Sequence, residues 1–279
     1  MTVRELLYKV TDILDKYEIE NASYEAKEIT AFCLKIKVSD LLFFQNNICS
    51  DLAERNASEC ARRRVNGEPL QYILGEWTFC SIPFKVGAGV LIPCPETEFI
   101  VYEANKFLKG KKDKVIFDLC TGSGCIGISV AVNNPECNVY LLDVSPDAVS
   151  YAEKNVLLNG VKNVTILKYD IFDGYKSEIL PLPDVILSNP PYIMSNEIAS
   201  LQAEVLKEPE LALDGGEDGL DFYRVIAEKW LGYIKDGGMF VLESGENQPP
   251  IIKNMIDGFS NVKIEKDFFS VERFVAGYK

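Results

Sequence analysis

Apolar side chains recur every three to four residues through the first part of the chain. In "VRELLYKVTDILDKY" this spacing places Leu6, Val10 and Leu14 on one face of a helix. "SYEAKEITAFCL" and "SDLAERNASECARRRV" continue the pattern, and Ser39 and Ser50 stand where helix N-caps would be. No strong strand pattern interrupts these segments. The pattern predicts a small helical domain over residues 1–74.

The pattern changes at about residue 75. In "GEWTFCSIPFKVGAGVLIPCPETE" the apolar residues come in short runs separated by Gly and Pro, which is typical of short strands joined by turns. These residues predict a β-hairpin linker over residues 75–98. A further helix is expected to begin near Glu98, in "TEFIVYEANKFL".

From residue 99 to residue 279, nearly continuous apolar runs alternate with helix-like segments. The strand-like runs include "KVIFDLC", "NVYLLDVS", "VTILKYD", "PDVILS" and "GGMFVLES". Runs of this kind belong to strands that helices cover on both faces, so the pattern predicts an α/β fold with a doubly wound, mostly parallel sheet of the Rossmann-like type. Ligands of such sheets bind at the carboxyl ends of the strands, which is where site residues are expected.

Composition narrows the range of functions. The 279 residues are 47% apolar and 25% charged, without a signal-peptide core or an apolar run that could span a bilayer, so we expect a cytoplasmic protein that binds no membrane. The chain has no histidine, which excludes Ser-His-Asp and Cys-His catalysis. Its eight cysteines lack metal-ligand spacing, so no metal site is expected.

Charge argues against direct binding of nucleic acid. The formal net charge is −13, whereas phosphate binding needs clustered Lys and Arg. The one basic cluster is formed by Arg62, Arg63 and Arg64. We interpret this cluster as a solvated helix face, because single charge runs usually are.

The first strand of the sheet ends in a glycine-rich turn. "DLCTGSGCIG" places Gly122, Gly124 and Gly127 in GxGxxG spacing between a strand and a helix, where glycine lets the backbone approach a ligand closely. Roughly twenty residues on, the second strand ends in Asp143, whose carboxylate can accept hydrogen bonds from both hydroxyls of a ribose. The two features together predict a site for a nucleotide-like cofactor.

The third strand ends in "YDIF". Here Asp170 could accept a hydrogen bond from the amino group of an adenine, and Ile171 could cover the face of that base. An aspartate that simply ends a strand fits the pattern equally well.

The tetrapeptide "NPPY", residues 189–192, follows the strand "PDVILS". Its prolines have no N–H to give to a sheet ladder, so the segment lies beyond the edge of the sheet. The side-chain carbonyl of Asn189 and the backbone carbonyl of Pro190 can together accept both hydrogens of an NH2 group, and Tyr192 offers a flat face to a planar amide or base. Dinucleotide oxidoreductases share the glycine motif, but hydride transfer has no use for two acceptors aimed at an amine. The two motifs together therefore indicate methyl transfer from S-adenosyl-L-methionine to nitrogen.

With these residues the chain resembles the class I methyltransferases, and within them the protein (glutamine-N5) methyltransferases of the PrmC/HemK family. The resemblance covers essentially the whole chain. It rests on "GEPLQYILGEWTF", "VLIPCPETE", "DLCTGSGCIGIS", "DVSPDAVSYAEKN", "SNPPYI", "EPELALDGGEDGLDFYR" and "ERFVAGY". "NPPY" itself is shared with adenine-N6 methyltransferases, whereas the linker and the "EPELALDGGEDGL" stretch are more particular to this family.

The resemblance implies a cofactor, a substrate and a set of site residues. The cofactor would be S-adenosyl-L-methionine, which leaves as S-adenosyl-L-homocysteine, and the substrate would be the glutamine of the GGQ motif in class I peptide chain release factors. The resemblance implies cofactor binding by Cys120, Thr121, Gly122, Ser123, Gly124, Asp143, Asp170, Ile171 and Asn189. It implies that the glutamine amide is held by Asn189, Pro190, Pro191 and Tyr192, with catalytic roles for Asn189, Pro190 and Tyr192.

The chain departs from the family pattern at two positions. The linker usually reads "RPETE", and here Cys94 replaces the arginine, so any ionic role of that arginine has no counterpart. The residue after Asp170 is often larger or aromatic, so Ile171 predicts a looser wall around the adenine.

The motifs leave other readings open. An adenine-N6 methyltransferase would use the same "NPPY", although the acidic balance of the chain argues against it. A nucleotide-binding module without catalytic activity would use the same glycine turn. The helical domain is expected to dock the release factor, and the alternative is that it only caps the hairpin and keeps the catalytic domain soluble.

Overall fold

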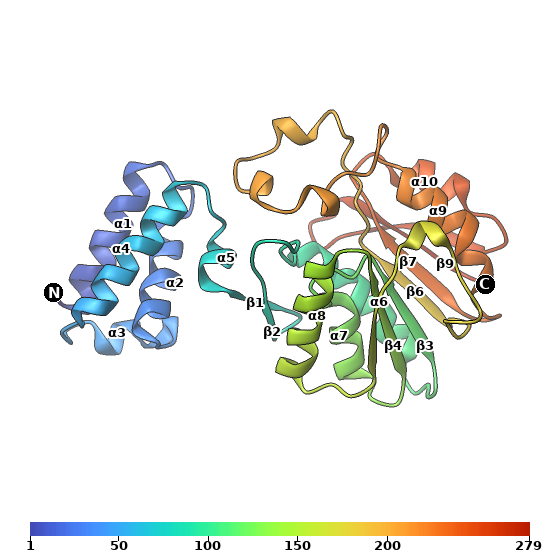
Figure 1. Ribbon diagram of the computed structural model, residues 1–279, viewed down its shortest axis with the longest axis horizontal. Helices are drawn as coiled ribbons and strands as arrows, with labels where there is room; N and C mark the ends of the chain where they lie inside the picture. The colour runs from blue at the N-terminus through green and yellow to red at the C-terminus, as the bar shows by residue number, and fades with distance from the viewer. The chain divides into compact units, whose positions relative to one another are not determined.

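The amphipathic pattern at the start of the chain forms a small helical unit (Figure 1). In the computed structural model, which describes residues 1–279, this unit consists of residues 1–75 together with residues 202–207. Its helices are α1 (Val3–Lys16), α2 (Ala22–Leu34), α3 (Leu41–Phe44), α4 (Asp51–Val65) and α5 (Leu70–Leu74). No helix anywhere in the chain has both the length and the apolar character needed to cross a bilayer.

The spacing of apolar residues determines which face of α1 is buried. Leu6, Val10 and Leu14 are fully buried in the core of the helical unit, as their spacing predicts. Ser50 caps α4 by accepting a hydrogen bond from the backbone N–H of Ala53, which satisfies one of the free donors at the start of the helix. The buried face of α1 and the cap of α4 could therefore be predicted from local sequence. The other predicted N-cap, Ser39, was wrong, because it lies inside the short turn Val38–Asp40 and caps no helix.

The basic cluster on α4 is not solvated throughout. Arg64 is only 4% exposed. Its guanidinium donates to Glu25 on α2, with an Nε–Oε2 distance of 2.6 Å, and to Glu204 in the second segment of the unit at 2.5 Å. A buried guanidinium needs such partners, because its desolvation is expensive unless the charge is paired. The interpretation as a solvated face was therefore wrong for Arg64, although it holds for Arg62.

The larger unit, residues 76–201 with residues 208–279, is built on a seven-stranded sheet in the order β5-β4-β3-β6-β7-β9-β8. The strands are β3 (Val115–Leu119), β4 (Asn138–Asp143), β5 (Val164–Lys168), β6 (Val185–Ser188), β7 (Met239–Glu243), β8 (Ser260–Lys266) and β9 (Glu272–Tyr278). Neighbouring strands from β5 to β7 are parallel, and β9 is antiparallel to both of its neighbours. The prediction of a doubly wound, mostly parallel sheet is confirmed.

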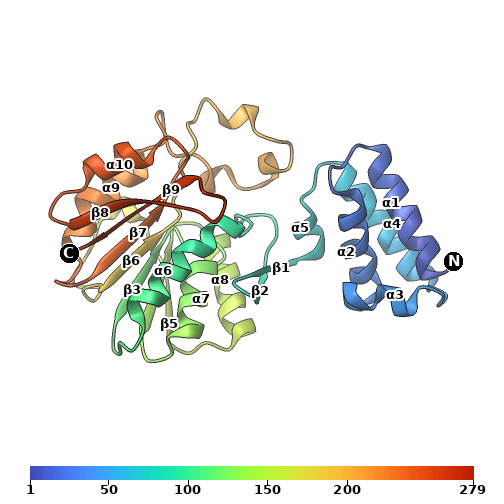
Figure 2. The same cartoon turned by 180° about the vertical axis from the view of Figure 1, so that it is seen from behind.

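Helices cover both faces of this sheet (Figures 1 and 2). One face carries α6 (Glu98–Leu108), α7 (Cys125–Asn133) and α8 (Pro146–Asn159), and the other carries α9 (Asp221–Lys229) and α10 (Pro249–Met255). Because side chains alternate along a strand, Ile116 packs under the first set of helices and its neighbour Phe117 under the second. These two cores hold the strands in register and so fix where the strand ends lie.

A short hairpin, β1 (Glu76–Phe79) and β2 (Ile82–Lys85), precedes α6. Its two turn residues, Cys80 and Ser81, have φ angles of 48° and 64°, the left-handed conformation that two-residue hairpins require. The Cys80 N–H donates to the Glu98 carboxylate at 2.7 Å, which ties this strained turn to the start of α6. The internal contacts group the hairpin with the larger unit. The division of the chain at residues 74 and 98 into separate domains remains a prediction.

Replacing Arg64 with Met is expected to destabilise the helical unit. The substitution leaves the Glu25 carboxylate buried without the guanidinium, and breaking a buried ion pair in this way costs about 3 to 5 kcal/mol. Urea unfolding, together with hydrogen exchange of the α2 and α4 amides, measures the loss. The matched control is Arg62→Met, because the ion pair of Arg62 with Glu59 is exposed and worth at most about 1 kcal/mol. Equal stability of the two variants would contradict the role assigned to Arg64.

Candidate active site

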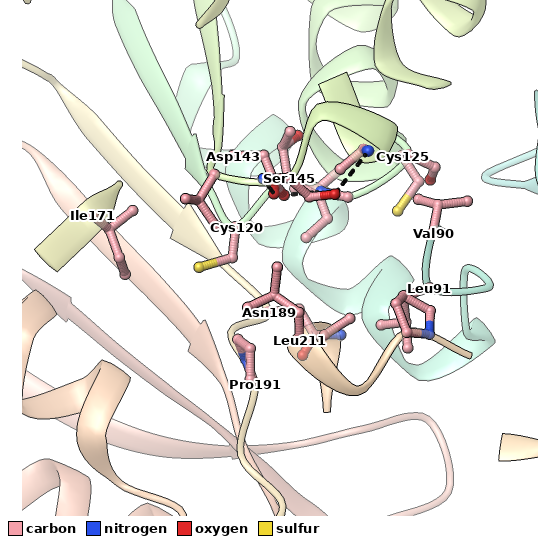
Figure 3. Close-up of a pocket in the computed structure, with 18 of the residues that line it drawn as sticks. Val90, Leu91, Cys120, Cys125, Asp143, Ser145, Ile171, Asn189, Pro191 and Leu211 are labelled. Carbon is pink, nitrogen blue, oxygen red and sulfur yellow. Dashed lines mark hydrogen bonds between the residues drawn. The ribbon is translucent and has the colours of Figure 1, made fainter. Parts of the chain in front are cut away.

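A cavity lies at the carboxyl ends of β3, β4 and β6, where the sequence predicts a ligand site (Figure 3). The predicted site residues that line it are Cys120, Thr121, Gly122, Ser123, Asp143, Asp170, Ile171, Asn189 and Pro191. The predicted residues that do not line it are Gly124, Pro190 and Tyr192. Seven stretches of the chain contribute to the lining, so the fold brings together residues that are far apart in the sequence. They lie within residues 89–97, 120–126, 143–148, 169–172, 189–191 and 209–212 and at Phe222.

The glycines after β3 have different functions. A Cβ atom added at Gly122 would meet only Val90 Cγ2, at 3.8 Å, so the space in front of this residue is open to a ligand. A Cβ atom added at Gly127 would lie 2.2 Å from Leu141 Cδ2, so this glycine instead lets α7 pack closely on β4. The GxGxxG spacing therefore combines a turn that faces the ligand with a glycine that serves helix packing.

Cys120 also adopts an unusual backbone conformation in this turn. Its φ angle is 57°, a region that costs a residue with a Cβ atom about 1 to 3 kcal/mol and that clusters at functional sites. Figure 3 shows its side chain among the labelled side chains of Ile171 and Asn189. Burial raises the pKa of the thiol well above its ordinary value, so Cys120 is neutral at physiological pH.

Asp118, a residue that none of the recognised motifs predicts as functional, anchors the glycine turn. It lies within β3 and is fully buried. Its Oδ2 accepts hydrogen bonds from the Thr121 hydroxyl at 2.5 Å and from the Gly127 N–H at 2.9 Å. Burial raises the pKa of this carboxyl to about 7. The available signal in the sequence was an aspartate inside the apolar strand "VIFDLC", since a buried carboxylate is costly unless it is hydrogen-bonded.

Asp143 is the last residue of β4 and is oriented by the backbone around it. Its Oδ2 accepts from the Gly122 N–H at 2.8 Å, and its Oδ1 accepts from the Ser145 N–H at 2.9 Å. Burial raises the pKa of this carboxyl, and the backbone donors oppose that shift. Each carboxylate oxygen has a second acceptor direction. Asp143 can therefore still accept two hydroxyl groups of a ligand.

The cavity wall beyond Asp143 is apolar and partly aromatic. Ile171 is 4% exposed, and its neighbour Phe172 meets Phe222 of α9 edge to face at a centroid distance of 5.1 Å. Asp170 is exposed and accepts a hydrogen bond from the Phe172 N–H at 2.9 Å. Neither aromatic residue was assigned a role from the sequence: Phe172 lies within "YDIF", whereas Phe222 comes from a distant helix. They supply aromatic surface that Ile171 alone lacks.

The segment "NPPY" leaves the sheet at the end of β6, as predicted. Asn189 lines the cavity, and its Nδ2 donates a hydrogen bond to the hydroxyl of Thr97 at 3.2 Å. Tyr192 is half-buried beside the cavity, and its backbone carbonyl accepts from Gln248 Nε2 at 2.9 Å. The contact expected between the Tyr192 ring and a planar group remains a prediction.

Residues far along the chain brace this segment. A Cβ atom added at Gly215 would lie 2.7 Å from the Cα of Tyr192, and one added at Gly219 would lie 2.4 Å from its carbonyl oxygen. Gln248 donates to both Tyr192 and Gly219, and its Oε1 accepts from the N–H of Gly245. The stretch "DGGEDG" is therefore glycine-rich because it packs directly on the backbone of "NPPY".

Two loops complete the cavity, one of residues 89–94 and one of residues 209–212. Glu208 joins them by accepting a hydrogen bond from the Ile92 N–H at 2.8 Å, and burial raises the pKa of its carboxyl to about 7. Cys94 is exposed at the edge of the cavity, and its thiol donates weakly to the Ile92 carbonyl. The position where the family pattern has an arginine therefore carries no positive charge here.

Known proteins resemble this chain over its whole length. The PrmC N-terminal domain matches residues 5–75, and the methyltransferase small domain matches residues 100–229. The release factor glutamine methyltransferase of Thermodesulfovibrio yellowstonii is 40% identical, over 96% of this chain and 95% of the relative. That of Aquifex aeolicus is 33% identical, over 96% of this chain and 94% of the relative. This chain belongs to the release factor glutamine methyltransferase family.

A solved methyltransferase from Pyrococcus furiosus shares the fold, with a TM-score of 0.52 and 20% identity over 80% of this chain and 98% of that one. The comparisons confirm the predicted resemblance to the PrmC/HemK family and the class I methyltransferase fold with an N-terminal helical region. The chain is therefore a methyltransferase, and a family of methyltransferases implies use of S-adenosylmethionine. The relatives do not favour the adenine-N6 alternative.

The cavity fits that cofactor. The space in front of Gly122 is open, so a ligand can lie against the backbone of the turn. The Asp143 carboxylate has acceptor directions left for the two hydroxyls of a ribose. Ile171, Phe172 and Phe222 provide an apolar wall for a flat base.

Proposed function

We propose that this chain transfers a methyl group from S-adenosylmethionine to the side-chain amide nitrogen, N5, of the glutamine in the GGQ motif of class I peptide chain release factors. The observation that carries the proposal is that Asn189 lines the same cavity as Gly122 and Asp143. An acceptor for an amide N–H thus lines the same cavity as groups that fit a nucleoside. The names of the full-length relatives support a release factor as the substrate.

The cofactor-binding side of the cavity has three parts. Residues 120–123 would surround the methionine end, the Asp143 carboxylate would accept the ribose hydroxyls, and Asp170 with Ile171 would border the adenine. When bound, S-adenosylmethionine supplies a methyl group on a positively charged sulfur. The contribution of the protein is to hold this group still and to keep water away from it.

The residues on the substrate side of the cavity have to overcome the low nucleophilicity of an amide nitrogen. The lone pair of an amide nitrogen is delocalised into its carbonyl, so attack on a methyl group requires the nitrogen to pyramidalise and to lose that resonance. As it does so, positive charge grows on the nitrogen and its N–H groups become stronger donors. The Asn189 side-chain oxygen, on a residue that lines the cavity, accepts one of those N–H groups, and we assign the other to the carbonyl of Pro190, which lies between two lining residues. The two acceptors stabilise the transition state more than the ground state.

Positioning supplies the rest of the rate enhancement. Holding the nitrogen, the methyl carbon and the sulfur in line converts an encounter between two molecules into a step within one complex. The reaction needs no covalent intermediate and no strong base. The proton leaves the nitrogen for water after the methyl group has been transferred.

We also propose that the helical unit docks a second region of the release factor. Its α3 helix and the residues that follow carry exposed apolar side chains. These are Leu42 (70% exposed), Phe43 (84%), Ile48 (76%) and Leu52 (60%). Large exposed apolar groups gathered in one short stretch mark interaction surfaces more often than isolated ones do. A second contact would select one glutamine among many by raising the effective concentration of the correct one.

Replacing Asp143 with Asn or Ala is expected to weaken S-adenosylmethionine binding by about 100-fold or more. Charge-assisted hydrogen bonds are worth about 1.5 to 3 kcal/mol each, and this carboxylate is expected to accept two from the ribose. Calorimetry with the folded variants measures the affinity. Asp236→Ala, at an exposed position, is the control. Unchanged affinity in the Asp143 variants would remove this residue from the cofactor site.

Replacing Asn189 with Ala is expected to leave cofactor affinity within a few-fold of wild type and to slow methylation about 100-fold or more. The loss of one acceptor aimed at a developing charge typically has this effect on the rate. Single-turnover methylation of a purified release factor, followed by mass spectrometry of its GGQ peptide, measures the rate. Asn254→Ala, on the exposed face of α10, is the control. A rate close to that of wild type would rule out the amide clamp.

Replacing Phe43 and Ile48 together with Ser is expected to lower kcat/KM for the intact release factor by about tenfold or more, because truncating buried interface anchors commonly costs more than 1 kcal/mol. Activity on a short GGQ peptide is expected to stay the same, since the peptide lacks the second region that would dock the helical unit. Leu157→Ser removes an equally exposed side chain, 81% exposed, from α8 and serves as the control. Equal activity of the two variants on the intact factor would show that the helical unit does not dock it.

A further inference from the structure

An asparagine side chain has two ends that differ in what they can bind. The oxygen accepts hydrogen bonds, whereas the NH2 group only donates, so an inverted Asn189 would face the substrate with the wrong group. The structure shows what determines the orientation: Nδ2 donates to the Thr97 hydroxyl at 3.2 Å. With the NH2 end held in this way, Oδ1 is left to accept a hydrogen bond inside the cavity.

The Thr97 hydroxyl is itself oriented. Thr97 lies at the start of α6, is 2% exposed, and has a single hydroxyl hydrogen. Because its oxygen accepts from Asn189, its hydrogen is free to bond the carboxyl of Glu243 at the end of β7. A directional chain of hydrogen bonds can therefore run from Asn189 through Thr97 to Glu243, whose carboxyl has a pKa that the Thr97 hydroxyl lowers against the effect of burial.

Glu243 is placed to act at the end of this chain. It is 3% exposed, and its Oε2 has no hydrogen-bond partner. A buried carboxylate with so few donors is costly, so its position needs an explanation beyond packing. No other role described for the cavity uses it.

We propose that Thr97 and Glu243 are positioning residues for methyl transfer, which hold the Asn189 amide with its oxygen toward the substrate. This inference rests on the proposed function, because it assigns the substrate amide as the donor to that oxygen. Negative charge on Glu243 polarises the Thr97 hydroxyl and, through it, the Asn189 amide. Its oxygen thereby becomes a better acceptor as positive charge develops on the substrate nitrogen.

The donor-to-acceptor direction of these hydrogen bonds depends on the charge of Glu243. Burial raises the pKa of its carboxyl to about 7; the Thr97 hydrogen bond and Arg273 on β9 oppose the shift, and Glu96 and Asp267 add to it. Burial raises the pKa values of Tyr192 and Tyr223, and Glu243 adds to both shifts, so these two phenols face it as neutral groups. The Cys94 residue is exposed, but desolvation of its sulfur and then Glu243 raise the pKa of its thiol, which is neutral as well. Below this pKa the protonated carboxyl can donate to Thr97, which then turns its own hydrogen toward Asn189. The asparagine would then present NH2 to the substrate, so the rate falls as the pH drops through about 7.

Kinetics of three variants test the inference. Thr97→Val, which keeps the shape of the side chain and removes the hydroxyl, is expected to lower kcat at least tenfold while the KM for S-adenosylmethionine stays within about twofold. Thr97→Ser restores the hydroxyl and is expected to recover most of the loss. Glu243→Gln can still accept from Thr97 but cannot ionise, so its pH–rate profile is expected to lack the fall below pH 7. A wild-type kcat in Thr97→Val, or an unchanged profile in Glu243→Gln, would overturn the inference.

A readout that involves no methyl transfer separates this inference from the proposed function. The NMR resonance of the Asn189 side-chain NH2 group is assigned in a 15N spectrum by its absence in Asn189→Ala. In the wild-type protein this resonance is expected to shift with pH around 7. One of the hydrogens of this group is expected to exchange slowly with solvent. Thr97→Val is expected to remove both effects. If wild type shows neither effect, the hydrogen-bond chain is wrong even if release factor is methylated. If both effects appear but release factor is not methylated, the proposed function fails and the orientation of Asn189 stands.

Discussion

The register of three parallel strands determines where this active site lies. Leu119, the last residue of β3, pairs with Leu142 of β4 on one side and with Ser188 of β6 on the other. The residues that follow these three positions are Cys120, Asp143 and Asn189. The glycine turn, the ribose acceptor and the amide acceptor thus meet because the strands that carry them end at the same level. A shift of one residue in either pairing would turn the following side chain to the opposite face of the sheet.

Three carboxylates, one buried and two half-buried, hold this arrangement together, and each of them carries an energetic penalty. Asp118 binds the glycine turn to the start of α7, Asp143 binds the same turn to the start of α8, and Glu208 joins the two loops that cover the cavity. Burial disfavours ionisation of all three, and the hydrogen bonds that they accept offset this cost. A network of this kind is rigid only while every donor is in place. The carboxylates therefore hold the site in position only together with their donors. Loss of one donor would leave a desolvated carboxylate without compensation and would destabilise the site.

The chain between "NPPY" and α9 connects the site with the rest of the protein. It leaves the sheet at Asn189. Further along, Asp214 forms an isolated parallel β-bridge with Ile193. Between these points, residues 202–207 belong to the helical unit, where Arg64 holds Glu204, and residues 209–212 line the cavity. Packing of this loop on Tyr192 requires glycine at positions 215 and 219. A Cβ atom at either position would lie within 3 Å of the Tyr192 backbone. The same stretch of sequence is therefore constrained by the helical unit, by the cavity and by the "NPPY" backbone.

Local sequence determined the elements and the three principal site motifs. The spacing of Leu6, Val10 and Leu14 gave the buried face of α1, and the apolar runs gave the strands of a doubly wound sheet. The positions of Gly122, Asp143 and Asn189 at strand ends followed from the same runs. A Gly turn follows the first strand, a Ser-Pro helix start follows the second, and a proline pair follows the one before Asn189.

Only the tertiary structure decided which distant residues support these motifs. Phe222 reaches the cavity from α9, Gln248 braces Tyr192 from the start of α10, and Thr97 orients Asn189 from the start of α6. The sequence alone predicts Arg64 as one of three surface arginines. The structure shows that it pairs with Glu25 and Glu204. The physical reason is the same in each case. A side chain's neighbours across the fold determine its burial and its hydrogen bonds, and local spacing contains no information about those neighbours.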